Sequence, residues 1–292
     1  MSYFHLNLIL KGKLTVCCLL MLPAIPLNAQ REAKQIGDFK ESISLNEHLR
    51  GTKRTLQYRP DGDEFVCVNG KNRYTRALYG SHSPFRVETS DRPVFAFYNN
   101  GRGGNISFKV ILRDGTELAL DCTGHCESRY SAGKRTYYLT DPSWGKGELR
   151  ISVLALADMD GAIWRFSPSN MPKGAILRWQ HGGATGKRLS RNGDMGVDPA
   201  DCFELPVEAT DLVTGELPLQ KEVYLVRGEV PEGYNVRKLY QQAEAASLAL
   251  ASHLKIETPD PYLNTLGGAL VAAADGIWDG QVWLHGAIGW RM

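Results

Sequence analysis

The feature that most constrains the fold of this chain is a long succession of short β-type segments between residues 55 and 229. Apolar and polar residues alternate in these segments, which are rich in Val, Ile, Phe, Tyr and Trp. Turn-forming dipeptides separate them, as at Asn69-Gly70, Asp114-Gly115 and Asp160-Gly161. Because alternation with a period of two gives each strand one buried face, the pattern predicts a large antiparallel β-sandwich. The clearest predicted strands are Phe65–Val68, Phe85–Val87, Val94–Tyr98, Ile106–Leu112, Thr136–Leu139, Leu149–Leu154, Ile163–Phe166, Ile176–Trp179 and Val223–Val226.

The periodicity changes from that of strands to that of helices at residue 235. Apolar residues recur at helical spacing over residues 235–254, and alanine becomes abundant. The segment Thr258–Pro261 then interrupts this pattern with two prolines. A second apolar helix is predicted over Tyr262–Trp278, with Thr258 or Asp260 as its N-cap.

These two helices suggest the beginning of a helical domain. A toroid of twelve helices needs on the order of 200 residues, whereas 56 residues remain over positions 237–292. An apolar helix without partners leaves one face unburied. We therefore expect a mainly β fold, in which a sandwich precedes a linker helix and the first helical hairpin of an incomplete (α/α)6 toroid. The expected divisions are a signal peptide over residues 1–29, an N-terminal linker over 30–54, the β-sandwich over 55–234, the linker helix over 235–257 and the start of the toroid over 258–292.

The first 29 residues have the order of a secretory leader. Lys11 and Lys13 precede the apolar run Leu14–Leu22, and the small residue Ala29 follows. We expect cleavage near Ala29 and export to the periplasm or beyond, without a membrane segment in the mature chain. Lipid attachment at a leader cysteine is the weaker alternative, because no small-residue motif precedes either cysteine there.

The mature chain is expected to be formally neutral. The leader contains two lysines and no acidic residue, so 32 basic and 32 acidic residues remain of the 34 and 32 in the whole chain. A neutral surface provides no electrostatic match for nucleic acid. A glycan ligand is therefore the expected partner, and the sequence does not indicate an oligomeric state.

Four cysteines lie beyond the leader, at Cys67, Cys122, Cys126 and Cys202. In an exported protein they allow three disulfide pairings, and a tight turn would bring Cys122 close to Cys126. Zinc binding at this pair is disfavoured because no second ligand pair follows. We expect free or disulfide-bonded cysteines, no metal and no cofactor.

Seven segments of the sequence together resemble a family of secreted Bacteroidetes proteins known as domain of unknown function number 4450. They are Tyr58–Phe65, Asn69–Arg73, Arg76–Gly80, Phe85–Glu88, Gly182–Arg188, Ser190–Asp194 and Thr258–Tyr262. The resemblance covers nearly all of the mature chain, from about Tyr58 to Met292. It implies a six-hairpin glycosidase architecture, with an N-terminal β-sandwich, a linker helix and an (α/α) toroid. In such folds the toroid usually supplies the catalytic carboxylates, so the resemblance implies that this chain is inactive alone.

Two regions contain candidate sugar-binding residues. One is the polar loop over residues 187–199, and the other is the aromatic tail, whose Trp-Leu-His run pairs rings that can stack on a pyranose with polar groups that bind hydroxyls. A solvated loop and an apolar seam between helices are the alternatives. With the polar start of the second helix included, the candidate residues are Arg191, Asn192, Asp194, Asp260, Trp283, His285, Trp290 and Arg291.

The sequence does not identify a catalytic pair. Glycoside hydrolysis needs two carboxylates that flank the scissile bond. Near the second helix the acids are Asp260, Asp275 and Asp279, of which the first is expected to cap the helix. The function predicted from sequence is thus the N-terminal portion of a glycoside hydrolase-like protein that acts on polysaccharide or oligosaccharide. The alternative is a non-catalytic carbohydrate-binding sandwich.

Overall fold

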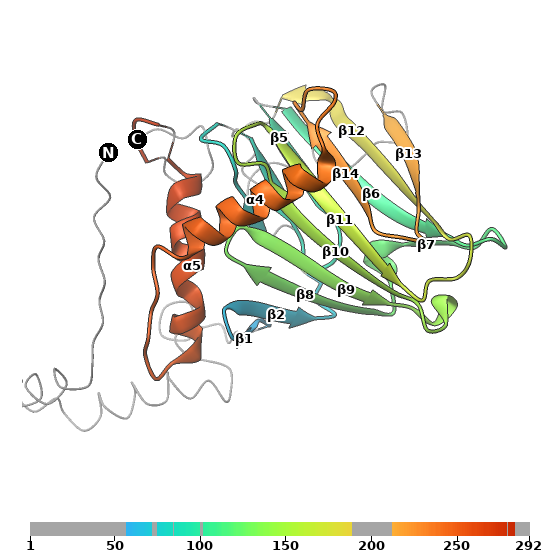
Figure 1. Cartoon of the computed structure of the whole chain (residues 1–292), viewed down its shortest axis with the longest axis horizontal. Helices are drawn as coiled ribbons and strands as arrows, with labels where there is room; N and C mark the ends of the chain where they lie inside the picture. Colours follow the sequence, from blue (N-terminus) through green and yellow to red (C-terminus); the bar gives the residue numbers. More distant parts are fainter. Residues whose placement is uncertain are drawn as a thin grey trace, which may run out of the picture.

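The computed structural model describes residues 57–71, 75–83, 85–99, 102–188, 212–278 and 280–283. Within these ranges the chain forms two antiparallel seven-stranded sheets that pack face to face (Figure 1). The first sheet has the order β1-β2-β8-β9-β10-β11-β14, and the second has the order β13-β12-β6-β5-β4-β3 with β7 paired to β6. In the first sheet the strands are β1 (Arg59–Asp61), β2 (Glu64–Val68), β8 (His125–Ser131), β9 (Lys134–Thr140), β10 (Glu148–Ala155), β11 (Gly161–Ser169) and β14 (Val223–Gly228). In the second they are β3 (Arg76–Leu78), β4 (Arg86–Thr89), β5 (Phe95–Asn99), β6 (Arg102–Ile111), β7 (Glu117–Ala119), β12 (Ile176–Arg188) and β13 (Val213–Pro218).

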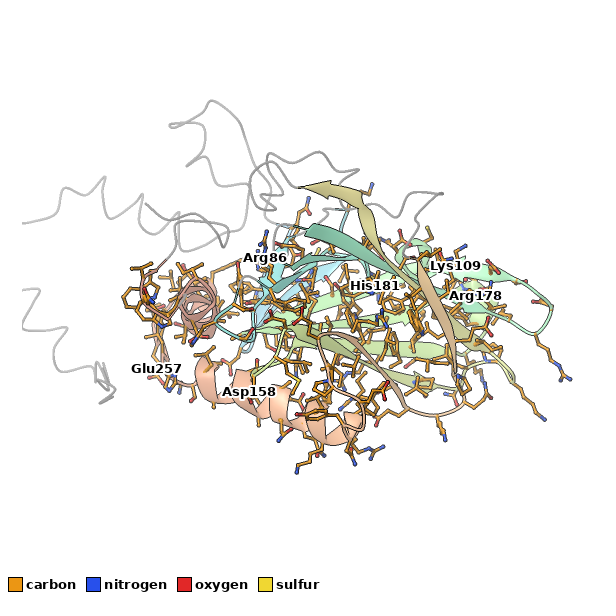
Figure 2. All side chains as sticks on the ribbon, turned by 90° about the horizontal axis from the view of Figure 1, so that it is seen from above. Arg86, Lys109, Asp158, Arg178, His181 and Glu257 are labelled. Carbon is orange, nitrogen blue, oxygen red and sulfur yellow. The ribbon has the colours of Figure 1, made fainter. Side chains whose placement is uncertain are left out.

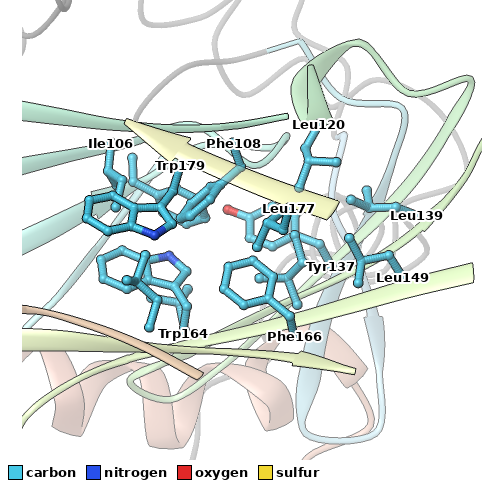
Figure 3. Packing of buried hydrophobic residues seen from close by; sticks show 14 of the residues in the cluster. Ile106, Phe108, Leu120, Tyr137, Leu139, Leu149, Trp164, Phe166, Leu177 and Trp179 are labelled. Atoms are coloured by element: carbon cyan, nitrogen blue, oxygen red, sulfur yellow. The ribbon is translucent and has the colours of Figure 1, made fainter. Parts of the chain in front are cut away.

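Aromatic side chains dominate the core between the two sheets (Figure 3). The ring of Phe95 makes edge-to-face contacts with Phe108, Tyr137 and Trp164 at centroid distances of 5.6–5.8 Å. Phe166 extends the cluster through Phe108, 5.1 Å away. These rings alternate with outward residues along their strands, so the period-two pattern of the sequence becomes the inner layer of the sandwich.

Two helices follow the sandwich. Helix α4 (Val236–Ala251) lies across the outer face of the first sheet (Figure 1), where Leu239, Tyr240 and Ala243 pack against apolar residues of β10 and β11. Helix α5 (Pro261–Gly276) packs against α4 and β1. No helix in the described ranges is long and apolar enough to span a membrane.

The expectation of a β-sandwich followed by helices is confirmed. Every strand predicted from the sequence overlaps an observed strand. Strands β1, β3, β7, β8 and β13 were not predicted. The side chain of Asp260 accepts a hydrogen bond from the backbone N–H of Tyr262, so Asp260 rather than Thr258 is the N-cap of α5.

Specific contacts fix both helices to the sandwich. The hydroxyl of Ser247 on α4 donates to the carbonyl of Ala132 in the β8–β9 turn, at 2.6 Å. The hydroxyl of Thr265 on α5 donates to the carbonyl of Gly62 in the β1–β2 turn, at 2.8 Å. The same edge of the sandwich therefore positions both helices.

Candidate functional site

A cavity of about 570 Å³ lies between this edge of the sandwich and the two helices. Its helical wall consists mainly of small and apolar side chains, and Asp275 of α5 adds one carboxylate to it. On α4 they are Ala243, Ala246, Ser247 and Leu250, and on α5 they are Leu266, Ala269, Leu270, Ala272 and Ala273. Most of these positions are three or four residues apart, so each helix presents one continuous face to the cavity.

The opposite wall is formed by the sandwich and contains the polar and aromatic groups. Strand β3 and the loop after it supply Arg76, Tyr79 and His82, and the end of β8 supplies Tyr130. The cavity thus has an apolar side and a side that can donate and accept hydrogen bonds.

The guanidinium of Arg76 is held by two tyrosine rings. Its Cζ lies 5.4 Å from the ring centroid of Tyr58 and 5.5 Å from that of Tyr130, both within cation–π distance. Its Nη1 donates to the carbonyl of Thr75 at 2.7 Å. Stacking and this one hydrogen bond fix the position of the charge and leave the other N–H groups without a hydrogen-bond partner in the described part of the chain.

A buried ion pair lies behind Arg76. Asp91 and Arg135 are fully buried, and their Oδ1 and Nη2 atoms are 3.6 Å apart. Asp91 also accepts hydrogen bonds from the hydroxyls of Thr75, at 3.1 Å, and Tyr58. Tyr58 in turn accepts from Arg135 at 2.8 Å. Burial, the largest cause, and the hydrogen bond to Asp91 raise the pKa of Tyr58, so this hydroxyl remains a proton donor to the carboxylate.

An imidazole–carboxylate contact joins the sandwich to α5 at the far end of the cavity. Nε2 of His82 lies 3.2 Å from Oδ1 of Asp275, and both side chains are partly exposed. Among the described residues, Asp275 is the carboxylate on the cavity wall. Glycosidic bond hydrolysis uses two carboxylates, and the described lining of the cavity supplies one of them.

The backbone of α5 packs directly on the ring of Tyr79. A Cβ atom added at Gly276 would lie 2.2 Å from Cδ2 of that ring, so only glycine permits this approach. Burial raises the pKa of Tyr79 to about 12, and nearby Glu88 adds to the effect. Glu88 forms a buried ion pair with Arg86 at 2.6 Å on β4, near the cavity end of the sandwich (Figure 2).

The predicted sugar-binding residues do not line this cavity where the structure describes them. Asp260 acts as the helix cap. Trp283 is 67% exposed, and its ring centroid lies 4.6 Å from that of Trp278. The remaining candidates lie outside the described residues, and they are Arg191, Asn192, Asp194, His285, Trp290 and Arg291. The acid Asp279 also lies outside them.

Sequence reasoning assigned no role to Arg76, Tyr79 or His82. The first two belong to the segment Arg76–Gly80, which was one of the segments that carried the family resemblance. The sequence does not show that this segment faces Asp275, which lies almost 200 residues later. Asp275 itself was considered as an acid and assigned no partner, whereas the structure pairs it with His82.

The described cysteines are free thiols. Cys122 is exposed, whereas Cys126 is buried in β8. Burial raises the pKa of the Cys126 thiol to about 12, so it is protonated and unreactive at neutral pH. The turn between the two does not join them, and Cys202 lies outside the described residues. In the described part of the chain, no three His, Cys, Asp or Glu side chains form a group that could hold a metal.

Comparison with known proteins gives one family match. Residues 100–229 match the family model described as Domain of unknown function (DUF4450). A comparison with curated proteins found no match to this chain. The matched residues cover the sandwich from β6 to β14, so this part of the chain is a DUF4450 domain.

Proposed function

We propose that this chain is part of an exported glycoside hydrolase-like protein that acts on polysaccharide or oligosaccharide. We further propose that it binds sugar in the cavity between the sandwich and helices α4 and α5. The observation that supports this function best is the two-sided character of the cavity. A pyranose has an apolar face of C–H groups and an edge of hydroxyls, and it needs both kinds of wall.

The size and the polar groups of the cavity agree with this proposal. Its volume of about 570 Å³ lies within the range of about 300–1,000 Å³ that is common for small-molecule sites. The tyrosine hydroxyls and His82 supply donors and acceptors on the sandwich side, and Asp275 supplies an acceptor from α5. The alanine faces of α4 and α5 leave room for a sugar ring on the other side.

A non-catalytic carbohydrate-binding protein is the second candidate. It is favoured by the single lining carboxylate among the described residues, because Asp275 is already in contact with His82. The two candidates share the binding site and differ in turnover.

A matched pair of alanine substitutions on α4 tests the binding site. Both Ala246 and Ala249 are exposed, but only Ala246 lines the cavity. The wild type and the variants Ala246→Phe and Ala249→Phe would be screened against neutral and acidic oligosaccharides by calorimetry. We expect Ala246→Phe to weaken binding at least tenfold and Ala249→Phe to leave it unchanged. Absence of binding by the wild type, or equal effects of both substitutions, would contradict the proposed site.

A reducing-end assay on the same oligosaccharides separates the two candidates. Release of new reducing ends, lost with Ala246→Phe, would favour the hydrolase. Saturable binding without such release would favour the non-catalytic protein.

A further inference from the structure

We infer that the ligand of this cavity is an anionic sugar, meaning a pyranose with a carboxylate or sulfate group, and that Arg76 binds the anionic group. This inference rests on the proposed sugar-binding function and specifies its ligand class. It is carried by the state of Arg76 and by the charges around the cavity.

Arg76 has no carboxylate partner among the described residues, although it lines the cavity. By contrast, Arg129 contacts the carboxylates of Asp61, Glu64 and Glu127 at 2.6–3.0 Å. Arg178 contacts Glu117 and Glu216 at 2.8–2.9 Å. The recorded contacts of Arg76 are the two tyrosine rings and the carbonyl of Thr75.

The acids near the cavity each have a partner other than Arg76. Asp91 is paired with Arg135, and Glu88 is paired with Arg86. Asp275, at the other end of the cavity, is in contact with His82. Arg76 is therefore left without a carboxylate partner on the described wall, and an anionic group of the ligand would complement its charge.

The chemistry of a guanidinium fits an oxyanion on a sugar. Its planar N–H groups bind the two oxygens of a carboxylate or sulfate side by side. Stacking between Tyr58 and Tyr130 fixes the orientation before the ligand arrives, so little side-chain entropy is lost on binding. A sugar ring attached to that group would then lie against the alanine faces of α4 and α5.

The test compares sugars that differ only in the anionic group. Binding of D-galacturonate, D-glucuronate and D-galactose 6-sulfate would be measured by calorimetry beside that of D-galactose and D-glucose. We expect at least one anionic sugar to bind about tenfold or more tightly than its neutral partner, because a hydrogen-bonded charge pair contributes about that factor. The sugars that show the preference identify the group as carboxylate or sulfate. High salt should reduce this preference without affecting the neutral sugars.

Substitutions at Arg76 assign the effect to this side chain. Arg76→Gln should abolish the preference and leave the affinity for the neutral sugar unchanged, whereas Arg76→Lys should retain part of it. Arg178→Gln is the matched control, since Arg178 lies on the sandwich away from the helices (Figure 2). Circular dichroism establishes that each variant is folded, and the salt dependence of the wild type tests the inference if a variant does not fold.

The possible results separate the inference from the proposed function. Saturable binding of neutral sugars with no anionic preference, or a preference that survives Arg76→Gln, would overturn the anionic-sugar inference alone. Failure of every sugar to bind would overturn both. Binding of decanoate in place of sugars, lost with Arg76→Gln, would instead show that the cavity takes an amphipathic carboxylate and would also overturn the inference.

Discussion

Removal of the Asp91 carboxylate is expected to destabilise the sandwich strongly. Asp91 and Arg135 are both 0% exposed, and 3.6 Å separates their charged atoms. Nε and Nη1 of Arg135 have no hydrogen-bond partner among the described residues, so the guanidinium depends on Asp91 for its compensating charge. An arginine in a protein cannot lose its proton. The Asp91→Ala variant therefore leaves a permanent positive charge in the interior.

The expected loss follows from the cost of breaking a buried ion pair, which is about 3–5 kcal/mol. With a urea m-value of about 3 kcal/mol per molar, this loss lowers the unfolding midpoint by about 1–1.7 M. Arg135→Met should cost less, because Asp91 keeps its hydrogen bonds from Tyr58 and Thr75. The double variant should be more stable than Asp91→Ala alone, since it contains no unpaired buried charge.

Urea unfolding monitored by tryptophan fluorescence measures these differences, because Trp164 lies in the core next to Phe95. Glu257→Ala is the control, because Glu257 forms an exposed ion pair with Lys255 on the surface (Figure 2) and its removal should leave the midpoint unchanged. A midpoint for Asp91→Ala equal to that of the wild type would refute the argument. So would a double variant that is less stable than Asp91→Ala.

Three further predictions concern α5. Gly276→Ala should lower Tm by about 2–10 °C, as expected for overpacking, because the new Cβ would lie 2.2 Å from the ring of Tyr79; an unchanged Tm would show that the helix end can shift freely. Burial raises the pKa of Tyr79 to about 12, against about 10 in an unfolded chain. The folded state therefore holds the proton of the Tyr79 hydroxyl more tightly than the unfolded chain does. The free energy of unfolding should fall as pH rises from about 10 to 12, where this difference is lost. Tyr79→Phe should reduce this alkaline loss of stability in denaturant titrations. Asp260→Ala should cost about 1 kcal/mol through loss of the cap and leave sugar binding unchanged, whereas a fall in sugar affinity would show that Asp260 also contacts ligand.

The strands that sequence reasoning missed show where alternation stops being informative. Strand β8 alternates fully between buried and less buried positions, but its buried residues are Cys126, Ser128 and Tyr130. Two of these three are small, and one of the two, Ser128, is polar, so a search for large apolar residues passes over the strand. Ser128 can be buried because its hydroxyl accepts a hydrogen bond from Arg135 and donates one to the carbonyl of Cys67. The alternation of β8 can therefore be recognised only once the hydrogen-bond partners of Ser128 are known.

The cavity was harder to predict than the sandwich because its walls come from six distant parts of the chain. The β3 region, the β8–β9 turn, α4 and α5 contribute most of the lining residues, and β2 and the end of β10 contribute the rest. The alanines at positions such as Ala246 and Ala269 indicate only helix propensity when taken alone. They become the wall of a site because Ser247 and Thr265 bring both helices onto the same edge of the sandwich.

The buried ion pair and the binding cavity share one structural cause. Thr75 donates its hydroxyl to Asp91 and accepts the guanidinium of Arg76 at its carbonyl, so one residue connects the pair to the cavity wall. Tyr58 does the same, since its hydroxyl contacts Asp91 while its ring supports Arg76. A charged pair in the interior is costly, and an apolar pair of similar volume would hold the two sheets together at least as well. The pair gives what an apolar core lacks, namely fixed polar partners for the two residues that position Arg76. The stability of the sandwich and the position of the cavity's cation therefore depend on the same carboxylate.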